Sequence, residues 1–452
     1  MSKVFGIVNL IISFIVCAFV PTKYSYEYSI LCVILYGVFV LEYLFFKKKE
    51  NYLDFDCLFF VSYFFVTLYY PAFMYEQDPF RYVMYELGFD KDTMSLSSGL
   101  ALLGISAYMA GSLFITKGTK KELDKDFGNH PTKKIKTTWI FLTAIILVIL
   151  YIATGGYMKL FNEYVGGGAE DISEGGIGKY FYAFFPAFLF AGIIAEFYNL
   201  KIINKKKVSF LSINKWGFTI TVVVFFMFFI AGSRTIPIQI VLLILGLYTF
   251  LYKPFGLLKF LASISIGFIV LAVVGFLRAK SNEGKEFYME DAAMDLIINN
   301  RNSFLAVERV ENYGINFGES MLSPILAPFP FSQSAVIGIF GLNEDDMRSA
   351  LVFTKDTFGY VSSWGLGTNI MADVYISFGM VGVIIFFILL GYFVNFSMKK
   401  SHTSLPYLIL YSIFISYAVY LARAEYFYFV RYFVWAYCII IFSLKFQKLK
   451  QS

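Results

Sequence analysis

Twelve long apolar stretches constrain this sequence more than any other feature. A helix that crosses a membrane needs about 20 apolar residues, and somewhat fewer where aromatic residues pad its ends. Hydrophobic residues make up 58% of the chain and charged residues only 15%, a balance that a soluble domain cannot bury. We therefore predict an all-α polytopic membrane protein with about twelve transmembrane helices, forming a single integral membrane domain over residues 1–452. The predicted spans are residues 4–20, 28–46, 54–74, 95–116, 137–153, 180–199, 216–232, 236–252, 257–277, 375–397, 404–420 and 431–444.

Lysine clusters mark one side of the membrane. They flank alternate ends of the predicted spans, and the positive-inside rule places such clusters in the cytoplasm. With twelve spans all of them fall on one side, so we expect a multi-pass protein with cytoplasmic N- and C-termini. Residues 216–252 allow two interpretations, a pair of spans or a re-entrant hairpin. The lysines concerned are Lys47 to Lys49, seven between Lys117 and Lys136, Lys201, Lys205 to Lys207, Lys215, Lys399, Lys400, Lys445, Lys448 and Lys450.

The predicted loops differ strongly in length between the two sides. Those on the lysine side are short, which excludes a soluble cytosolic catalytic domain, whereas residues 278–374 form one long extracytoplasmic loop. This loop is too long for a connector and shows helical patterning, so we expect it to contain helices and to be functional. Residues 321–341 within it are apolar, but three prolines interrupt them. We expect that stretch to stay outside and to lie against the membrane surface.

Arginine and lysine are distributed differently in this topology. All eight arginines fall on the outer side, although lysine is the commoner cation and the positive-inside rule does not distinguish the two. The planar guanidinium binds phosphate and carboxylate groups in a bidentate manner and stays charged when partly desolvated. The set therefore favours a phosphate-bearing ligand near the membrane surface, while snorkelling or ion pairing remains an alternative for any single arginine.

The titratable residues narrow the possible chemistry on that side. Both histidines, His130 and His402, lie on the cytoplasmic side, so a proton acceptor at the outer face must be a carboxylate, a tyrosine or the substrate itself. Asp373 and Glu425 are the outer carboxylates closest to the membrane, with ion pairing to nearby arginines as the alternative role. The four cysteines all lie in apolar runs, which disfavours a disulfide framework or a zinc site. We predict no metal and no cofactor.

Three features together resemble the Wzy-type O-antigen and capsular polysaccharide polymerases. They are "GSRT" at 232–235 between two apolar stretches, the long outer loop after it, and "GLGTNIMADVYISFGMVGVIIFFILLGYFV" at 365–394. The resemblance covers roughly residues 215–440. It implies a glycosyltransferase of the bacterial cytoplasmic (inner) membrane, related to the GT-C architecture. Such an enzyme acts at the periplasmic face and transfers a growing glycan from undecaprenyl pyrophosphate onto a lipid-linked oligosaccharide repeat unit.

The expected site residues follow from this chemistry. A pyrophosphate-linked sugar already has a good leaving group, so the enzyme must position the acceptor and stabilise negative charge on the departing pyrophosphate. We expect Arg234 to be foremost, with Thr235 and Ser233 as further donors and with Asp373 and Glu425 as catalytic carboxylates. Arg301 and Arg309 lie about 80° apart on a helix, close enough to share one face. The remaining pyrophosphate-binding candidates are Arg278, Arg423 and Arg431.

Other functions remain open at this point. An O-antigen ligase-like transferase has a similar architecture, although the outer-loop histidine of that family has no counterpart here. A lipid-linked oligosaccharide flippase or other transporter would need charges inside its helices and has no need for a long one-sided loop. The expected partners are the undecaprenyl-pyrophosphate-linked oligosaccharide and membrane lipid, with a chain-length regulator and a flippase as further possibilities, and no nucleic acid.

Overall fold

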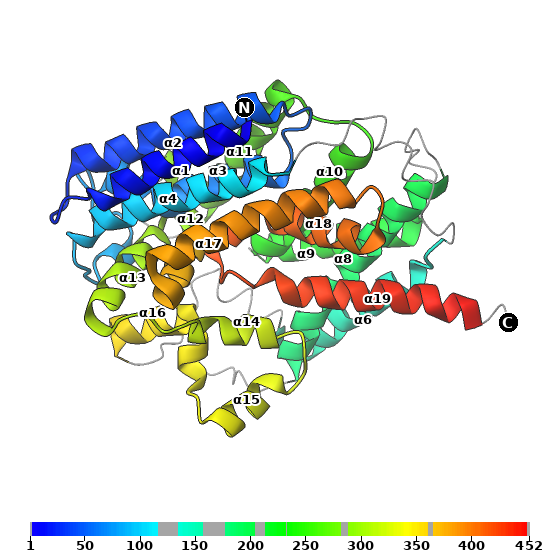
Figure 1. Ribbon diagram of the computed structural model, residues 1–452. Helices are drawn as coiled ribbons and strands as arrows, with labels where there is room; N and C mark the ends of the chain where they lie inside the picture. Colours follow the sequence, from blue (N-terminus) through cyan, green and yellow to red (C-terminus); the bar gives the residue numbers. More distant parts are fainter. Residues whose placement is uncertain are drawn as a thin grey trace. The chain divides into compact units, whose positions relative to one another are not determined.

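The computed structural model describes residues 2–115, 134–156, 177–203, 213–231, 233–281, 288–359 and 365–449. Within these ranges the chain is helical and has no β-strand (Figure 1). It divides into two compact units. Unit 1 comprises residues 1–117, 256–396 and 418–428, and unit 2 comprises residues 118–255, 397–417 and 429–452. Each unit is described by itself.

Unit 1 combines long apolar helices with a series of short ones. The long helices are α1 (Ser2–Ala18), α2 (Tyr26–Lys47), α3 (Phe55–Thr67), α4 (Thr93–Leu113), α11 (Leu257–Ser281) and α17 (Ile370–Lys400, in this unit up to residue 396). The predicted outer loop does contain helices: η5 (Met289–Ala293), α12 (Met294–Ile297), α13 (Asn300–Tyr313), η6 (Glu319–Met321), α14 (Leu322–Leu326), α15 (Ser332–Phe340), η7 (Glu344–Met347) and α16 (Ser349–Phe358). Shorter turns elsewhere are η1 (Tyr70–Met74), η2 (Val83–Tyr85) and η8 (Leu421–Arg423).

Unit 2 is built from six helices in the part of the chain that the structure describes. They are α6 (Thr138–Ala153), α8 (Gly178–Ile203), α9 (Lys215–Ile230), α10 (Thr235–Leu251), α18 (Leu405–Tyr417) and α19 (Phe429–Leu449). Residues 216–252, for which two interpretations were open, form the separate helices α9 and α10, which pack against each other. Helix α9 ends at Ile230 and α10 begins at Thr235.

Every predicted span coincides with an apolar helix. Five of these helices, α2, α4, α8, α17 and α19, are long and apolar enough to cross a membrane, and the other seven contribute apolar helical stretches of 10–17 residues, which for α11 is the part Leu257–Val270. Apolar helices on this scale indicate a membrane protein. The count of twelve crossings, and the side of the membrane that each end faces, remain predictions.

Small residues let α4 and α17 pack closely in unit 1. A side chain at Gly111 of α4 would collide with the carbonyl oxygen of Ile388, and one at Gly391 of α17 would collide with that of Tyr108. Close backbone approach at small residues is the usual way in which membrane helices associate, because lipid offers no hydrophobic driving force between them. This packing holds α17, whose beginning carries Asp373.

Polar side chains at the lysine end of unit 1 join four helices. The carboxylate of Asp56, at the beginning of α3, accepts hydrogen bonds from Tyr43 of α2 at 2.6 Å and from Tyr108 of α4 at 2.5 Å. It also accepts from Lys49 Nζ at 2.8 Å and from Asn395 Nδ2 of α17 at 3.2 Å. These ends of α2, α3, α4 and α17 therefore meet at Asp56, close to Lys49.

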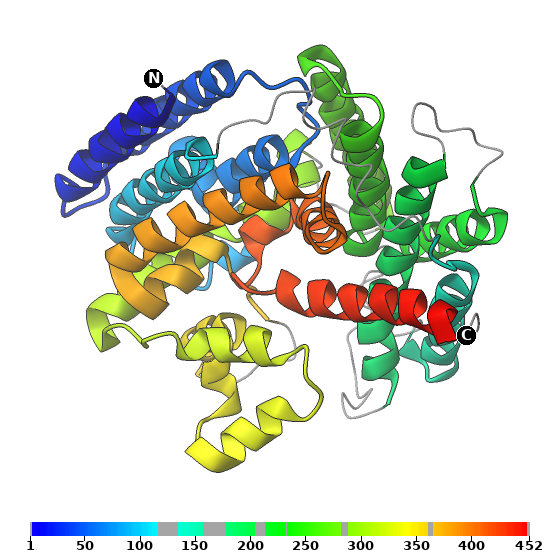
Figure 2. The ribbon, with the colours of Figure 1, turned by 45° about the vertical axis from the view of Figure 1, so that its right-hand side comes forward.

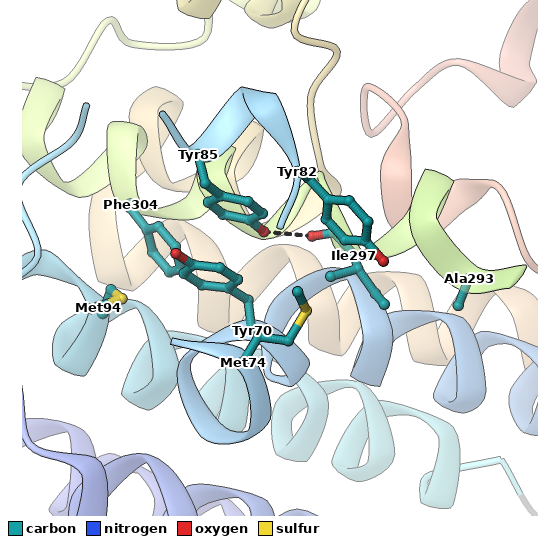
Figure 3. Packing of buried hydrophobic residues seen from close by; sticks show 8 residues of the cluster. All are labelled: Tyr70, Met74, Tyr82, Tyr85, Met94, Ala293, Ile297 and Phe304. Carbon is teal, nitrogen blue, oxygen red and sulfur yellow. Dashed lines mark hydrogen bonds between the residues drawn. The ribbon is translucent and has the colours of Figure 1, made fainter. Parts of the chain in front are cut away.

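An aromatic core in unit 1 joins residues 70–89 to the beginning of the long segment 288–359 (Figure 3). Tyr70 and Tyr85 stack with ring centroids 3.7 Å apart and planes inclined by 2°. The hydroxyl of Tyr85 donates to the carbonyl oxygen of Ile297 at 2.8 Å, and Phe304 of α13 packs against the same cluster (Figure 3). This core fixes the beginning of α13 beside η1 and η2.

We predict that Tyr85→Phe lowers the thermal stability of the protein. The stacked ring would remain, but the carbonyl oxygen of Ile297 would lose the Tyr85 hydroxyl and keep only the Asn300 side chain as a side-chain donor, at a cost of about 0.5–1.5 kcal/mol for one hydrogen bond. The measurement is the melting temperature of the purified protein in detergent. Tyr313→Phe is the matched control, because Tyr313 is 77% exposed. Equal melting temperatures for the two variants would contradict this account of the aromatic core.

Candidate functional site

The candidate site of unit 1 begins at the segment 365–369, which leads into α17. The amide nitrogen of the Asn369 side chain donates to the carbonyl oxygen of Asn299 at 2.8 Å and to Ser303 Oγ at 2.9 Å. Its amide oxygen accepts from the backbone nitrogen of Ala372 at 2.8 Å, within the first turn of α17. Gly367 has φ +70°, a conformation that suits glycine, and an added side chain would approach Asn299 at 3.1 Å. This segment therefore fixes the beginning of α17 on α13.

A glycine divides α17 into two pieces. Gly379 has φ 63° and ψ −160°, so the helix is interrupted there rather than running straight through the span predicted from residue 375. The interruption frees the carbonyl oxygen of Ile376, which accepts a hydrogen bond from the backbone nitrogen of Asn316 at 2.8 Å. The short first piece, which carries Asp373 and Ser377, is thereby connected to the outer segment and set apart from the long apolar piece.

Asp373 lies at the centre of a buried polar cluster. Its side chain is fully enclosed and accepts hydrogen bonds from Ser320 Oγ at 2.8 Å and from the backbone nitrogen of Tyr426 at 3.2 Å. Ser377 Oγ lies 3.1 Å from Ser320 Oγ and 3.2 Å from the hydroxyl of Tyr426. The cluster thus brings together η6, the beginning of α17 and the turn at residues 424–428.

Glu425 lies beside this cluster and connects it to an exposed arginine. The sequence singled out Asp373 and Glu425 together, and the structure places them as neighbours across Tyr426, whose backbone nitrogen bonds Asp373. The Glu425 side chain is 5% exposed, and its Oε1 lies 3.2 Å from Nε of Arg348, whose side chain is 44% exposed. Ion pairing, the alternative role considered for Glu425, is therefore present. Arg348 is the part of this pair that a ligand outside the protein can reach.

A second accessible arginine, Arg423, lies just before the turn that carries Glu425. Arg423 closes η8, two residues before Glu425, and its side chain is 31% exposed. Its Nη1 lies 4.0 Å from the carboxylate of Asp295 of α12, which is 40% exposed. Two accessible guanidinium groups and one nearly buried carboxylate thus come from a short stretch of surface in unit 1. An arrangement of this kind suits an anionic ligand that also needs a proton acceptor nearby.

Tyr426 can contribute to this site only as a neutral hydroxyl. Burial raises the pKa of Tyr426 well above its usual value, and the nearby charge of Asp373 raises it further. The phenol therefore keeps its proton at neutral pH. It can exchange hydrogen bonds with Ser377 but cannot act as a base.

Arg301 and Arg309 do share one face of α13, as their spacing predicted, and both contact the end of α16. Arg301 is 1% exposed and donates to Thr357 Oγ1 at 3.1 Å and to the carbonyl oxygen of Gly88 at 2.8 Å. Burial lowers the pKa of Arg301 to about 10, so the group remains charged at neutral pH. Arg309 forms an ion pair with Asp356 at 2.5 Å. Both guanidinium groups thus have protein partners in this structure.

The remaining predicted residues lie in unit 2 or outside the described side chains. Arg234 is the residue that precedes α10, and Thr235 begins that helix. Arg431 of α19 donates to the hydroxyl of Tyr432 at 3.0 Å and lies over the rings of Tyr432 and Trp435. Arg278 belongs to α11, but its side chain lies outside the described residues. Arg234 belongs to unit 2, whereas Asp373 and Glu425 belong to unit 1.

Sequence reasoning assigned no role to Arg348, Ser320 or Tyr426. Arg348 was counted among the outer arginines, but nothing in the spacing of residues 348 and 425 indicates that they meet. Ser320 and Tyr426 carry no signal beyond their polarity. In the part of the chain that the structure describes, no group of three or more His, Cys, Asp or Glu side chains could hold a metal ion.

The comparison with protein families covers nearly the whole chain. Residues 2–449 match the family described as O-antigen polysaccharide polymerase Wzy. The chain belongs to this family. No curated protein and no solved structure matches it. Membership in the Wzy family gives a polymerase activity on polysaccharide, which is a glycosyltransferase reaction, and it agrees with the apolar helices of a membrane protein.

We predict that Asp373→Ala destabilises the protein and that Asp373→Asn does so much less. Alanine would leave the buried backbone nitrogen of Tyr426 without its acceptor, at a cost of about 1–3 kcal/mol, and would leave Ser320 with only Ser377 as a side-chain partner. Asparagine can accept from Tyr426 with its oxygen and donate to Ser320 with its nitrogen. Melting temperatures in detergent test this, with exposed Glu344→Ala as the control. Equal losses for the two Asp373 variants would show that the hydrogen bonds are not what matters there.

Proposed function

We propose that this member of the Wzy family polymerises lipid-linked repeat units at the outer, periplasmic face of the bacterial cytoplasmic membrane. The donor is a growing glycan on undecaprenyl pyrophosphate, and the acceptor is a lipid-linked oligosaccharide repeat unit. The observation that carries the proposal is the family match over residues 2–449. The accessible arginines around Glu425 support it, because both substrates carry pyrophosphate. A flippase and a chain-length regulator are the partners that such a reaction would need.

The proposed reaction is a single group transfer. The oxygen of an acceptor hydroxyl forms a bond to the anomeric carbon of the donor sugar, and the bond from that carbon to the pyrophosphate oxygen breaks. The electron pair leaves on undecaprenyl pyrophosphate, and the hydroxyl proton passes to a carboxylate and then to water. The protein must therefore hold the acceptor, accept one proton and stabilise the charge on the leaving group. No metal is required for these steps.

We assign the proton acceptor to Glu425 and a positioning role to Asp373. Glu425 lies directly behind Arg348, which is accessible, so a hydroxyl held by Arg348 would come within its reach. Asp373 is enclosed and already accepts two hydrogen bonds, one of them from the backbone of Tyr426. It therefore orients the turn that carries Glu425. This division of roles rests on the contact of Glu425 with the exposed Arg348 and on the enclosure of Asp373.

We assign pyrophosphate binding to arginines that are not enclosed. Arg423 is 31% exposed in unit 1, and Arg234, with Thr235 beside it, precedes a helix N-terminus in unit 2, where backbone nitrogens favour anions. Arg431 and Arg278 remain further candidates. Arg301 and Arg309 contribute indirectly, by holding α13 against α16 and, through Arg301, against Gly88.

Complementation of a deletion strain tests the role of Arg234. We expect the deletion to leave surface glycan with single repeat units, and Arg234→Ala to be inserted in the membrane but unable to restore the ladder of longer chains on gels. Lysine at this position should also fail, because it cannot bind two phosphate oxygens with one planar group. A full ladder from Arg234→Lys would reject bidentate binding. Loss of every repeat unit, single ones included, would instead favour a ligase or a flippase.

Glu425→Gln tests the proton acceptor in the same assay and with purified protein. We expect the polymerisation rate to fall by about 10²- to 10⁴-fold, the usual contribution of a positioned base, while binding of the lipid-linked substrate is retained. Glu344→Gln is the control, since Glu344 is exposed on the nearby η7. A rate within twofold of the unaltered protein would remove Glu425 from the mechanism and leave the family assignment intact.

A further inference from the structure

Helices α14 and α15 form a hairpin in which α15 stands away from the other helices of unit 1 in both views (Figures 1 and 2), while α14 contacts η6. The two helices pack on each other. Gln333 Nε2 donates to Ser323 Oγ at 2.5 Å, and Ser332 Oγ donates to the carbonyl oxygen of Leu326 at 2.8 Å. These bonds fold the hairpin on itself with Ser323, Ser332 and Gln333 on the inside, whereas Ser334 is exposed. The hairpin is thus a defined element and takes no part in the site described above.

The outward side of this hairpin is apolar, the reverse of what water favours. No residue of α15 is buried, and the most exposed side chains are Phe331 at 83%, Ile339 at 75% and Phe340 at 70%. Phe329, in the connection before α15, is 60% exposed. The partly covered positions on the inner side include the polar Ser332 and Gln333. A helix in water turns its apolar face to the protein and its polar face outward. Here polar groups bond inside and large apolar groups point out.

The hairpin also lacks charge over its whole length. No charged residue occurs between Glu319 and Glu344, and three consecutive acids, Glu344, Asp345 and Asp346, follow immediately. Protein interfaces usually have a polar rim around their apolar centre, with arginine enriched. Neither occurs on this stretch. An uncharged segment bounded sharply by acidic residues fits a boundary between an apolar and an aqueous phase.

Backbone strain marks the exposed tip of the hairpin. Phe331 has φ 65° and ψ −5°, in the left-handed region that bulky residues rarely adopt. Strain of this kind is retained where the surroundings or a ligand compensate for it. The strained backbone here holds one of the most exposed aromatic rings of the hairpin, and exposing such a ring to water is unfavourable.

We propose that the α14–α15 hairpin inserts its Phe331–Ile339 side into a glycerophospholipid bilayer at the level of the headgroups and upper acyl chains. Shallow insertion of an apolar helix face is how interfacial helices bind membranes. Insertion itself does not depend on the polymerase activity. If the proposed function also holds, the hairpin keeps Arg348, which directly follows η7, near the depth at which a lipid-linked pyrophosphate lies.

Fluorescence of labelled single-cysteine variants tests the insertion. Cys438→Ser removes the exposed cysteine, and the other three are buried. An environment-sensitive nitrobenzoxadiazole label is attached at Ile339→Cys, and at Glu344→Cys as the matched control outside the hairpin. The protein is reconstituted in phosphatidylcholine–phosphatidylglycerol vesicles that contain no polyprenyl lipid. We expect blue-shifted emission at Ile339, severalfold stronger quenching by brominated lipid than at Glu344, and protection from aqueous iodide.

Labels at further positions, and addition of polyprenyl pyrophosphate, distinguish the lipid bilayer from the other molecules that could cover this side of the hairpin. Labels at Ala335 and Val336 should differ, with the outward Ala335 quenched more strongly by brominated lipid. Iodide quenching at Ile339 equal to that at Glu344 would overturn the proposal. So would protection that arises only after polyprenyl pyrophosphate is added, which would indicate the substrate tail. Protection that rises with protein density and is insensitive to brominated lipid would indicate a second protein copy and would overturn it as well. None of these readouts requires polymerisation.

Discussion

The enclosed carboxylate of Asp373 is the interaction on which the outer part of unit 1 depends. A buried acid needs hydrogen-bond donors for its oxygens, because a polar group without a partner in an apolar interior lowers the stability of the fold. Asp373 meets this requirement with donors from two other elements, the hydroxyl of Ser320 and the backbone of Tyr426. The hydrogen bonds therefore fix η6, the beginning of α17 and the turn at residues 424–428 relative to one another, although they are far apart in the sequence. Glu425 has a defined position because its neighbour Tyr426 does.

The same requirement operates at the other end of α17. Asn395, near the end of that helix, donates to Asp56, which also accepts from α2, α4 and Lys49. Between these two polar ends, Gly111 and Gly391 let α4 and α17 approach closely. The long helix is thus fixed by hydrogen bonds at both ends and by backbone packing in the middle. The kink at Gly379 lets its first piece serve the site while the second remains a regular apolar helix.

The arginines differ in role according to their exposure. Arg301 is enclosed and joins Gly88 to Thr357 of α16, whereas Arg348 and Arg423 reach the surface beside Glu425. A preference for arginine over lysine on this side of the protein therefore has two physical reasons. Guanidinium tolerates burial because it stays charged and has several donors, and it binds phosphate bidentately where it is exposed. The sequence pattern alone does not separate these reasons, since both produce the same residue.

The helical class, the position of every apolar helix and the division of residues 216–252 into two segments were accessible from the sequence, because hydrophobic runs and breaks are local properties. Asp373 and Glu425 were chosen as candidates because they lie beside predicted spans, and the structure places them as neighbours, while their catalytic roles remain proposals. The Glu425–Arg348 pair, the enclosure of Arg301 and the outward apolar side of α15 did not. They depend on contacts between segments far apart in the chain, and only the tertiary structure decides which side chains those contacts bury.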